Sequence, residues 1–143
     1  MCMLIKRSIQ TKKPNKDGFY TGWKVVTKAN FPIFFHQGYN IGENISSRSY
    51  WLSRYSSKLL SNQLTLKEIV DQKVDYGFHI CLDRKDARLA NQYLYTRRKK
   101  IIKVYYKRQD VLAYGVWNDD TNVKQVVVDK MTIKSFEGVG WNL

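Results

Sequence analysis

The segment 46–58 combines arginines, aromatic rings and hydroxyl groups in a pattern that suits a phosphorylated ligand. Arg48, Trp51 and Tyr55 follow at intervals of three and four residues, which would place them on one side of a helix. Arg54 adds a second guanidinium group. Guanidinium groups bind phosphate oxygens in pairs, and aromatic rings stack on bases. The segment is therefore a candidate nucleotide-binding site, and the alternative interpretation is a loop or short helix that wraps the core.

A second candidate is His79, in a strand that leads directly into a helix. The apolar positions of 78–82 alternate with His79 and Cys81, which is typical of a strand. Asp83 suits the N-cap of the following helix, and Asp86 suits its first turn. The unpaired N–H groups of a helix N-terminus could hold an anion beside His79. If Asp83 and Asp86 occupy that end instead, the stretch is a core junction between strand and helix.

The third candidate is the densest basic run, Arg97-Arg98-Lys99-Lys100, from which Arg97, Arg98 and Lys100 are predicted ligand-binding residues. The whole chain carries 25 Lys and Arg against 12 Asp and Glu, a net charge of +13. Residues 1–30 and 81–143 each contribute +6, whereas residues 31–80 contribute +1. So large an excess predicts an anionic partner, which could be nucleic acid, a nucleotide or an acidic protein surface.

The types of residue in the chain favour a binding protein over an enzyme, but they do not exclude an enzyme. Acidic residues are scarce and placed as caps and turns, and two cysteines cannot build a metal cluster, so neither a metal site nor a cofactor is predicted. An ADP-ribosyltransferase-like site with His79, a tyrosine and Glu137 stays open as an enzymatic alternative. The chain contains no apolar run of the roughly 18 residues that a membrane span needs. We expect a cytoplasmic protein that does not associate with membranes.

The predicted fold is a single α+β domain over 1–143, mainly antiparallel sheet with one central helix at about 84–95 and one or two short helices in 46–72. Residues 1–28 are predicted to form a β-hairpin, in which Tyr20, Lys24, Val26 and Lys28 share a face that is either solvated or turned toward a ligand. Strands at 100–106, 110–117 and 123–133 are predicted to form an antiparallel meander. The aromatic tail 136–143 would dock on the core or on a second copy, which leaves a homo-oligomer open.

Several short motifs resemble those of small phage and prophage accessory proteins that share a Gly-Phe-His strand, a following helix and a β meander. The motifs are Gly-Trp-Lys-Val-Val at 22–26, Tyr-Gly-Phe-His-Ile at 76–80, Asp-Ala at 86–87, Lys-Val-Tyr at 103–105, Ala-Tyr-Gly at 113–115 and Val-Asp-Lys-Met-Thr-Ile at 128–133. The resemblance implies a phage accessory gene in a bacterial host cell, and such genes often encode inhibitors of bacterial defence. It carries over no activity and no functional residue.

Two functional hypotheses follow from the charge and from this resemblance. In the first, a non-catalytic anti-defence protein binds and sequesters a small phosphorylated nucleotide signal. In the second, an inhibitor of the anti-CRISPR type docks on a nucleic-acid-binding complex or on nucleic acid itself. An enclosed nucleotide site would keep its ligand at moderate salt, whereas binding to polynucleotide would fall steeply as salt rises.

Overall fold

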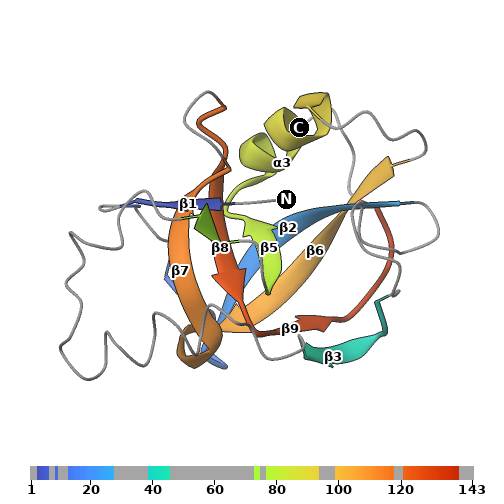
Figure 1. The fold of residues 1–143 in the computed structure, drawn as a ribbon. Coiled ribbons are helices and arrows are strands. Elements are labelled where there is room, and N and C mark those ends of the chain that lie inside the picture. Colours follow the sequence, from blue (N-terminus) through green and yellow to red (C-terminus); the bar gives the residue numbers. More distant parts are fainter. Residues whose placement is uncertain are drawn as a thin grey trace, which may run out of the picture.

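The computed structural model describes residues 3–6, 9, 13–27, 39–45, 73–74, 77–93, 99–117 and 121–138. Figure 1 shows the elements that these residues form. Along the chain they are β1 (Met3–Ile5), β2 (Phe19–Thr27), β3 (Gly42–Ile45), β4 (Lys73–Val74), β5 (Phe78–Cys81), α3 (Arg84–Tyr93), β6 (Lys99–Lys107), the 3-10 helix η2 (Arg108–Asp110), β7 (Val111–Val116), β8 (Lys124–Val128) and β9 (Lys130–Ile133).

The strands form one sheet in the order β3-β9-β6-β2-β5-β8-β7-β1-β4, and every pair of neighbours is antiparallel. This confirms the predicted α+β class with a mainly antiparallel sheet and a helix that begins at Arg84. The short helices predicted in 46–72 lie outside the described residues.

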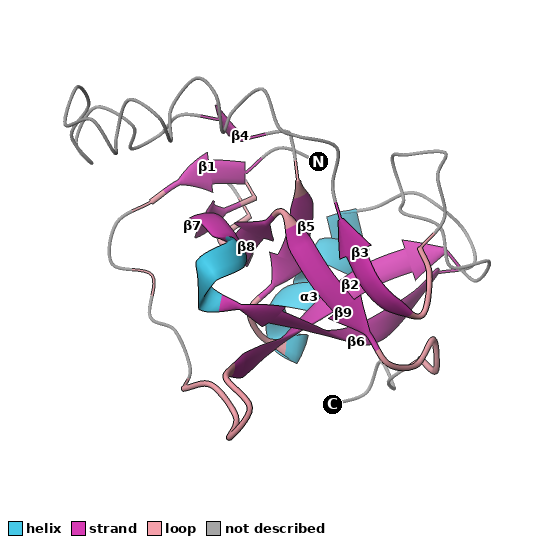
Figure 2. Ribbon diagram, turned by 90° about the horizontal axis from the view of Figure 1, so that it is seen from below, coloured by secondary structure: helices cyan, strands magenta, loops and turns pink. Residues whose placement is uncertain are grey.

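The sheet curls because the chain bends at Asp129, the residue between β8 and β9. Although β8 and β9 are consecutive along the chain, three other strands separate them in the sheet. The backbone N–H of Asp129 donates a hydrogen bond to the carbonyl of Asp110, 3.0 Å away, which ties the bend to the end of η2. Figure 2 shows β3, β9 and β6 side by side. The curl encloses an apolar interior on one side of the sheet.

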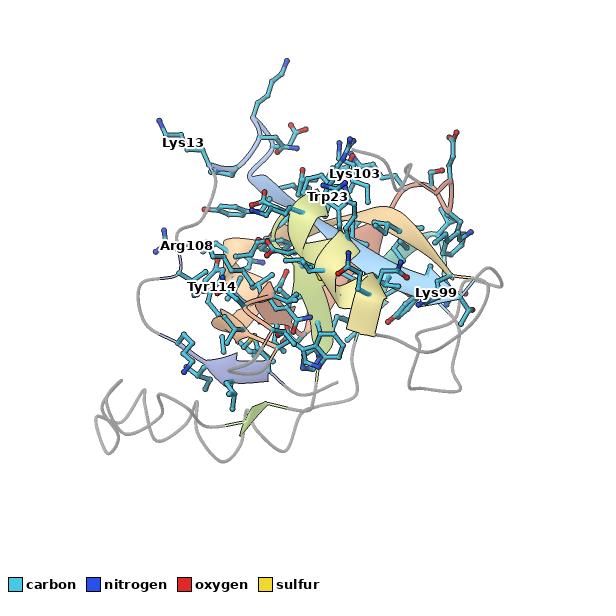
Figure 3. The ribbon with its side chains drawn as sticks, turned by 90° about the horizontal axis from the view of Figure 1, so that it is seen from above. Lys13, Trp23, Lys99, Lys103, Arg108 and Tyr114 are labelled. Carbon is cyan, nitrogen blue, oxygen red and sulfur yellow. The ribbon has the colours of Figure 1, made fainter. Side chains whose placement is uncertain are left out.

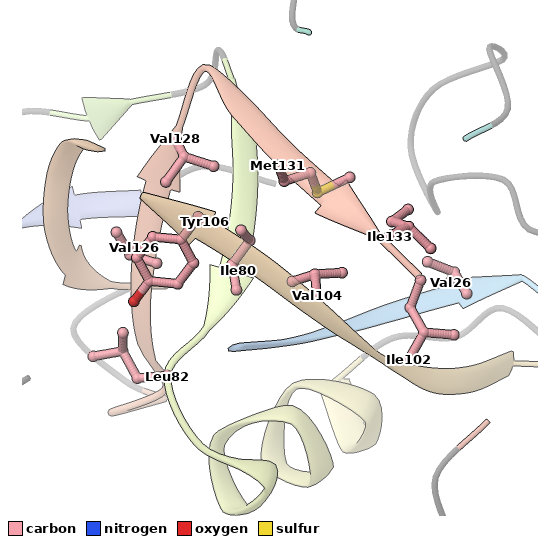
Figure 4. Close-up of a cluster of buried hydrophobic side chains, with 10 residues drawn as sticks. All are labelled: Val26, Ile80, Leu82, Ile102, Val104, Tyr106, Val126, Val128, Met131 and Ile133. Carbon is pink, nitrogen blue, oxygen red and sulfur yellow. The ribbon is translucent and has the colours of Figure 1, made fainter. Parts of the chain in front are cut away.

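The interior cluster comes from strands on both sides of the curl (Figure 4). Its buried members are Val26, Ile80, Leu82, Ile102, Val104, Tyr106, Val126, Val128, Met131 and Ile133. A second cluster lies on the opposite face, between the sheet and α3, and consists of Trp23, Val25, Cys81, Ala87, Ala90, Ile101 and Val123. Because successive strand residues point to opposite faces, each of β2, β5 and β6 contributes to both clusters. The predicted alternation in 78–82 and the predicted strand at 100–106 are therefore confirmed.

Gly22 permits the close approach of β2 and β5. A Cβ atom at this position would overlap the Ile80 side chain and lie 3.1 Å from the carbonyl oxygen of Cys81. Any larger residue would push β5 away from β2, because the obstacle includes backbone that cannot turn aside. The glycine is thus a packing requirement of the sheet centre.

Two predicted strand pairings are wrong. Residues 1–28 do not form a hairpin, because β1 pairs with β4 and β7, while β2 pairs with β5 and β6. Of the predicted meander, only the pairing of β7 with β8 exists, since β6 lies between β2 and β9. The predicted strand 123–133 is in fact β8 and β9. Alternation reveals that a segment is a strand but not which segment it pairs with.

A candidate basic and aromatic binding face

The outer face of β2 and β6 is covered by α3 at one end only. The helix packs on Trp23, Val25 and Ile101, and the Arg84 guanidinium lies 5.7 Å from the centre of the Trp23 ring. Figure 3 shows Trp23 and Lys103 near one end of the helix and Lys99 toward its other end. At that far end, the Lys99 ammonium donates a hydrogen bond to the carbonyl of Asn91, 3.0 Å away. The strands continue past Trp23, so the outer face extends beyond the contacts of the helix.

The part of the outer face beyond Trp23 carries three exposed lysines and two half-buried aromatic rings. We call it the basic aromatic face, and define it by Phe19, Lys103, Tyr105, Lys107 and Lys134. The register places Phe19 opposite Lys107, and Tyr105 opposite a residue of β2 on one side and of β9 on the other. Three strands that are distant in sequence therefore meet at Tyr105.

Tyr105 is the centre of this face. The Lys134 ammonium lies 4.4 Å from the centre of the Tyr105 ring, and the Lys103 ammonium lies 5.6 Å from it. The Phe19 ring packs edge-on against Tyr105 with 6.5 Å between ring centres, and the Lys107 ammonium lies 5.1 Å from the Phe19 ring centre. Each exposed cation–π contact contributes about 0.5–1 kcal/mol, so the lysines are held near the rings but remain free to exchange partners.

Carboxylates lie next to the basic aromatic face, at the corner where Asp110, at the end of η2, meets Asp129, between β8 and β9. Burial raises the pKa of Asp110, and the charges of Asp129 and Glu43 raise it further, while Lys130 and Lys107 act in the opposite direction. Three acidic groups therefore share this corner with two lysines. Lys107 lies at the border between this corner and the basic aromatic face, so an anion on the face would be attracted most strongly toward Lys103 and Lys134.

The inner face of β2 holds a buried lysine, Lys24. The prediction that this face of the strand is solvated or turned toward a ligand is therefore wrong for Lys24. Lys24 is 8% exposed, so its side chain is neither solvated nor turned toward a ligand at the surface. Its ammonium donates a hydrogen bond to the carbonyl of His79, 2.7 Å away, and lies 5.6 Å from the centre of the Tyr39 ring. Burial lowers the pKa of Lys24 from 10.5 to about 8, with a small opposing effect from Cys81. Lys24 therefore belongs to the interior and not to the basic aromatic face.

At the junction between β5 and α3, Asp86 caps the N-terminus of the helix, which agrees with the interpretation of this stretch as a core junction. One carboxylate oxygen of Asp86 accepts a hydrogen bond from the N–H of Asp83 at 3.2 Å, and the other accepts one from the N–H of Lys124 at 3.1 Å. Asp86 is buried, as is His79, which is 4% exposed. Because a carboxylate already occupies the helix N-terminus, an anion there would meet a like charge. This end of α3 serves as a core junction.

Cys81 is a buried free thiol. Burial raises its pKa to about 12. The thiol therefore stays protonated at neutral pH and is a poor nucleophile.

Of the other predicted ligand-binding residues, only Lys100 lies in the described part of the chain. Its ammonium donates a hydrogen bond to the carbonyl of Phe136, 2.8 Å away, and lies 5.8 Å from the Phe136 ring centre. It fastens the segment after β9 to β6. The remaining predicted residues, Arg48, Trp51, Arg54, Tyr55, Arg97 and Arg98, lie outside the described residues.

The sequence places Lys103 and Lys107 in the basic region 81–143, but their aromatic partners were not predicted. The alternation of Lys103, Tyr105 and Lys107 along one strand was a usable signal, because these residues must share a face. Nothing in the sequence placed Phe19 and Lys134 beside them, since that placement depends on the pairing of β2 and β9 with β6.

Within the described ranges, no three His, Cys, Asp or Glu residues are grouped so that they could hold a metal ion. In the same ranges, no helix has the length and apolar character needed to cross a membrane. No family model, curated protein or solved structure matches the chain.

Proposed function

We propose that this protein is a non-catalytic binder of nucleic acid, and that the basic aromatic face is its binding site. The observation that carries the proposal is the position of the Lys103 and Lys134 ammonium groups over the Tyr105 ring, beside Lys107 and Phe19, where α3 does not pack. Lysines supply charge for phosphates, and half-buried rings at the surface supply area for contact with bases or sugars.

The net charge of +13 supports the same function at longer range. A strongly positive protein attracts polyanions before any contact forms, and each phosphate that a lysine neutralises releases a counterion. The lysines of the basic aromatic face then determine where on the protein the phosphate backbone binds. Such binding requires no enclosed pocket and no reaction.

In its biological setting, we propose an anti-defence protein of phage origin that acts in the cytoplasm of a bacterial host. By binding nucleic acid, or the nucleic-acid-binding complex that would otherwise hold it, the protein would block recognition by a defence system. The resemblance of the 22–26, 76–80 and 128–133 motifs to phage accessory proteins supports this setting.

Sequestration of a small phosphorylated nucleotide stays a prediction, because six of its eight proposed ligand residues lie outside the described residues. Native mass spectrometry of protein purified from cells that express a bacterial defence system tests it. A co-purifying mass in the nucleotide range supports sequestration, and protein without added mass argues against it.

The proposed function is tested by two double variants with the same loss of charge. Lys103→Gln with Lys107→Gln removes two ammonium groups from the basic aromatic face. Lys85→Gln with Lys124→Gln removes two from exposed positions on α3 and β8, outside this face. Fluorescence anisotropy with a labelled oligonucleotide, repeated at several salt concentrations, gives the affinity and its salt dependence.

We expect the face variant to bind more weakly than the control variant. Its slope of log affinity against log salt should fall by about 0.7–0.9 for each lost phosphate contact. Equal weakening of both variants would mean that only the total charge matters, and would refute a localised site.

A further inference from the structure

Resting on the proposed function, we infer that the basic aromatic face selects single-stranded nucleic acid, whose bases stack on Tyr105 and Phe19 while its phosphates bind Lys103, Lys107 and Lys134. The two rings and the three ammonium groups belong to one contiguous arrangement on β2, β6 and the residue after β9. Rings and cations in this alternation match a chain in which bases and phosphates also alternate.

The two rings are partly exposed to solvent. The side chains of Lys103 and Lys134 are exposed, yet their ammonium groups lie over the Tyr105 ring, so a flexible solvated group already occupies the position that a base would take. Stacking of a base on an aromatic ring is stronger than an exposed cation–π contact. A base would therefore displace an ammonium group, which would then be free to bind the neighbouring phosphate.

A duplex cannot use the rings in this way. Its bases are stacked on one another, and a protein reaches only their edges, through grooves that admit an inserted helix or a two-stranded ribbon. The rings of the basic aromatic face are half-buried in a sheet surface, and they cannot enter a groove. Duplex DNA would meet only the lysines, whereas a single strand would meet the lysines and the rings together.

An acidic protein surface is the main competing partner, and the chemistry separates the two. Carboxylates would bind the three ammonium groups, but contact with the faces of the aromatic rings would not strengthen their binding. Loss of the Tyr105 ring would then leave binding almost unchanged. Dependence on the ring is therefore the property that identifies a single-stranded partner.

The test compares three probes: a labelled single strand, the duplex of the same sequence, and heparin as a polyanion without bases. The proteins are the wild type, Tyr105→Leu, which removes the ring but keeps apolar bulk, and Tyr105→Phe, which keeps the ring. Circular dichroism and thermal melting establish that each variant is folded. Phe19→Leu provides a second ring deletion on a different strand in case Tyr105→Leu does not fold.

We expect the wild type to prefer the single strand over the duplex. Tyr105→Leu should lose about 5- to 150-fold in affinity for the single strand, which corresponds to one stacked base. It should bind heparin as the wild type does, and Tyr105→Phe should bind all three probes as the wild type does. Equal binding of single strand and duplex by the wild type would overturn the inference, as would equal losses of Tyr105→Leu for the single strand and for heparin.

These outcomes distinguish the inference from the proposed function. If heparin and duplex bind through the face lysines but the single strand has no advantage, the inference fails and the proposed function stands. If no probe binds the wild type in a salt-dependent way, the proposed function fails and the inference fails with it.

Discussion

Replacement of Lys24 by methionine should change how the stability of the protein depends on pH. The Lys24 pKa is lowered from 10.5 to about 8 because the ammonium group is buried between β2, β5 and the Tyr39 ring. A shift of this size corresponds to about 3 kcal/mol of unfavourable burial at pH values well below 8. Lys24→Met removes the charge and keeps a flexible side chain of similar length.

The sign follows from the protons that each state binds. Between pH 8 and 10.5 the unfolded chain keeps the Lys24 proton while the folded chain has lost it, so the free energy of unfolding rises with pH. From pH 7 to pH 9 the wild type should gain about 1.3 kcal/mol relative to Lys24→Met. Ionisation of Cys81 and the tyrosines occurs in both proteins and cancels in this difference.

At pH 7 the variant should be more stable than the wild type by up to about 2 kcal/mol, because the relief of burial exceeds the cost of the His79 carbonyl that loses its donor. Urea unfolding followed by tryptophan fluorescence at pH 7 and pH 9 measures both quantities. If the difference between the two proteins were the same at both pH values, Lys24 would not be a buried ionisable group, and the account of the interior would be wrong.

Two further predictions concern the junction between β5 and α3. Asp86→Ala should lower the free energy of unfolding by about 1–3 kcal/mol, because the N–H groups of Asp83 and Lys124 both lose their acceptor, and urea unfolding measures this loss. Asp86→Ser, which offers one acceptor, should lose less, and an unaffected Asp86→Ala would contradict the capped junction. In a Cys2→Ser background, Cys81 should react with a thiol reagent only after denaturant is added, because the thiol is buried and its pKa is raised to about 12. Rapid labelling of the folded protein would show that the second cluster is open to solvent.

The local features of the fold could be predicted because they depend on neighbouring residues. The Asp83 and Asp86 signals give the start of α3 directly, since capping involves residues within one helical turn. Alternation likewise assigns the two faces of 78–82 and 100–106. In both cases the physical cause acts within a few residues.

The features that were missed depend on contacts between distant segments. The bend at Asp129 sends β9 to the far side of β6, and no short pattern specifies that partner. The sequence pattern predicts an exposed or ligand-facing position for Lys24, since lysines are almost never fully buried. The curl of the sheet that encloses Lys24 is a long-range property, which no short pattern specifies. The positive charge of the basic aromatic face was predictable, but the meeting of Phe19, Tyr105 and Lys134 requires the strand order.

The central claim is that nucleic acid binds at the basic aromatic face, and photo-crosslinking tests it most directly. A single strand that carries a photoreactive base is irradiated with the wild-type protein, and the crosslinked peptides are identified by mass spectrometry. We expect crosslinks in the peptides that contain Phe19 and Tyr105, and their loss in the Lys103→Gln, Lys107→Gln variant. Crosslinks confined to 46–58 or 97–100 would contradict it and would place the site on the segments that the sequence alone suggested.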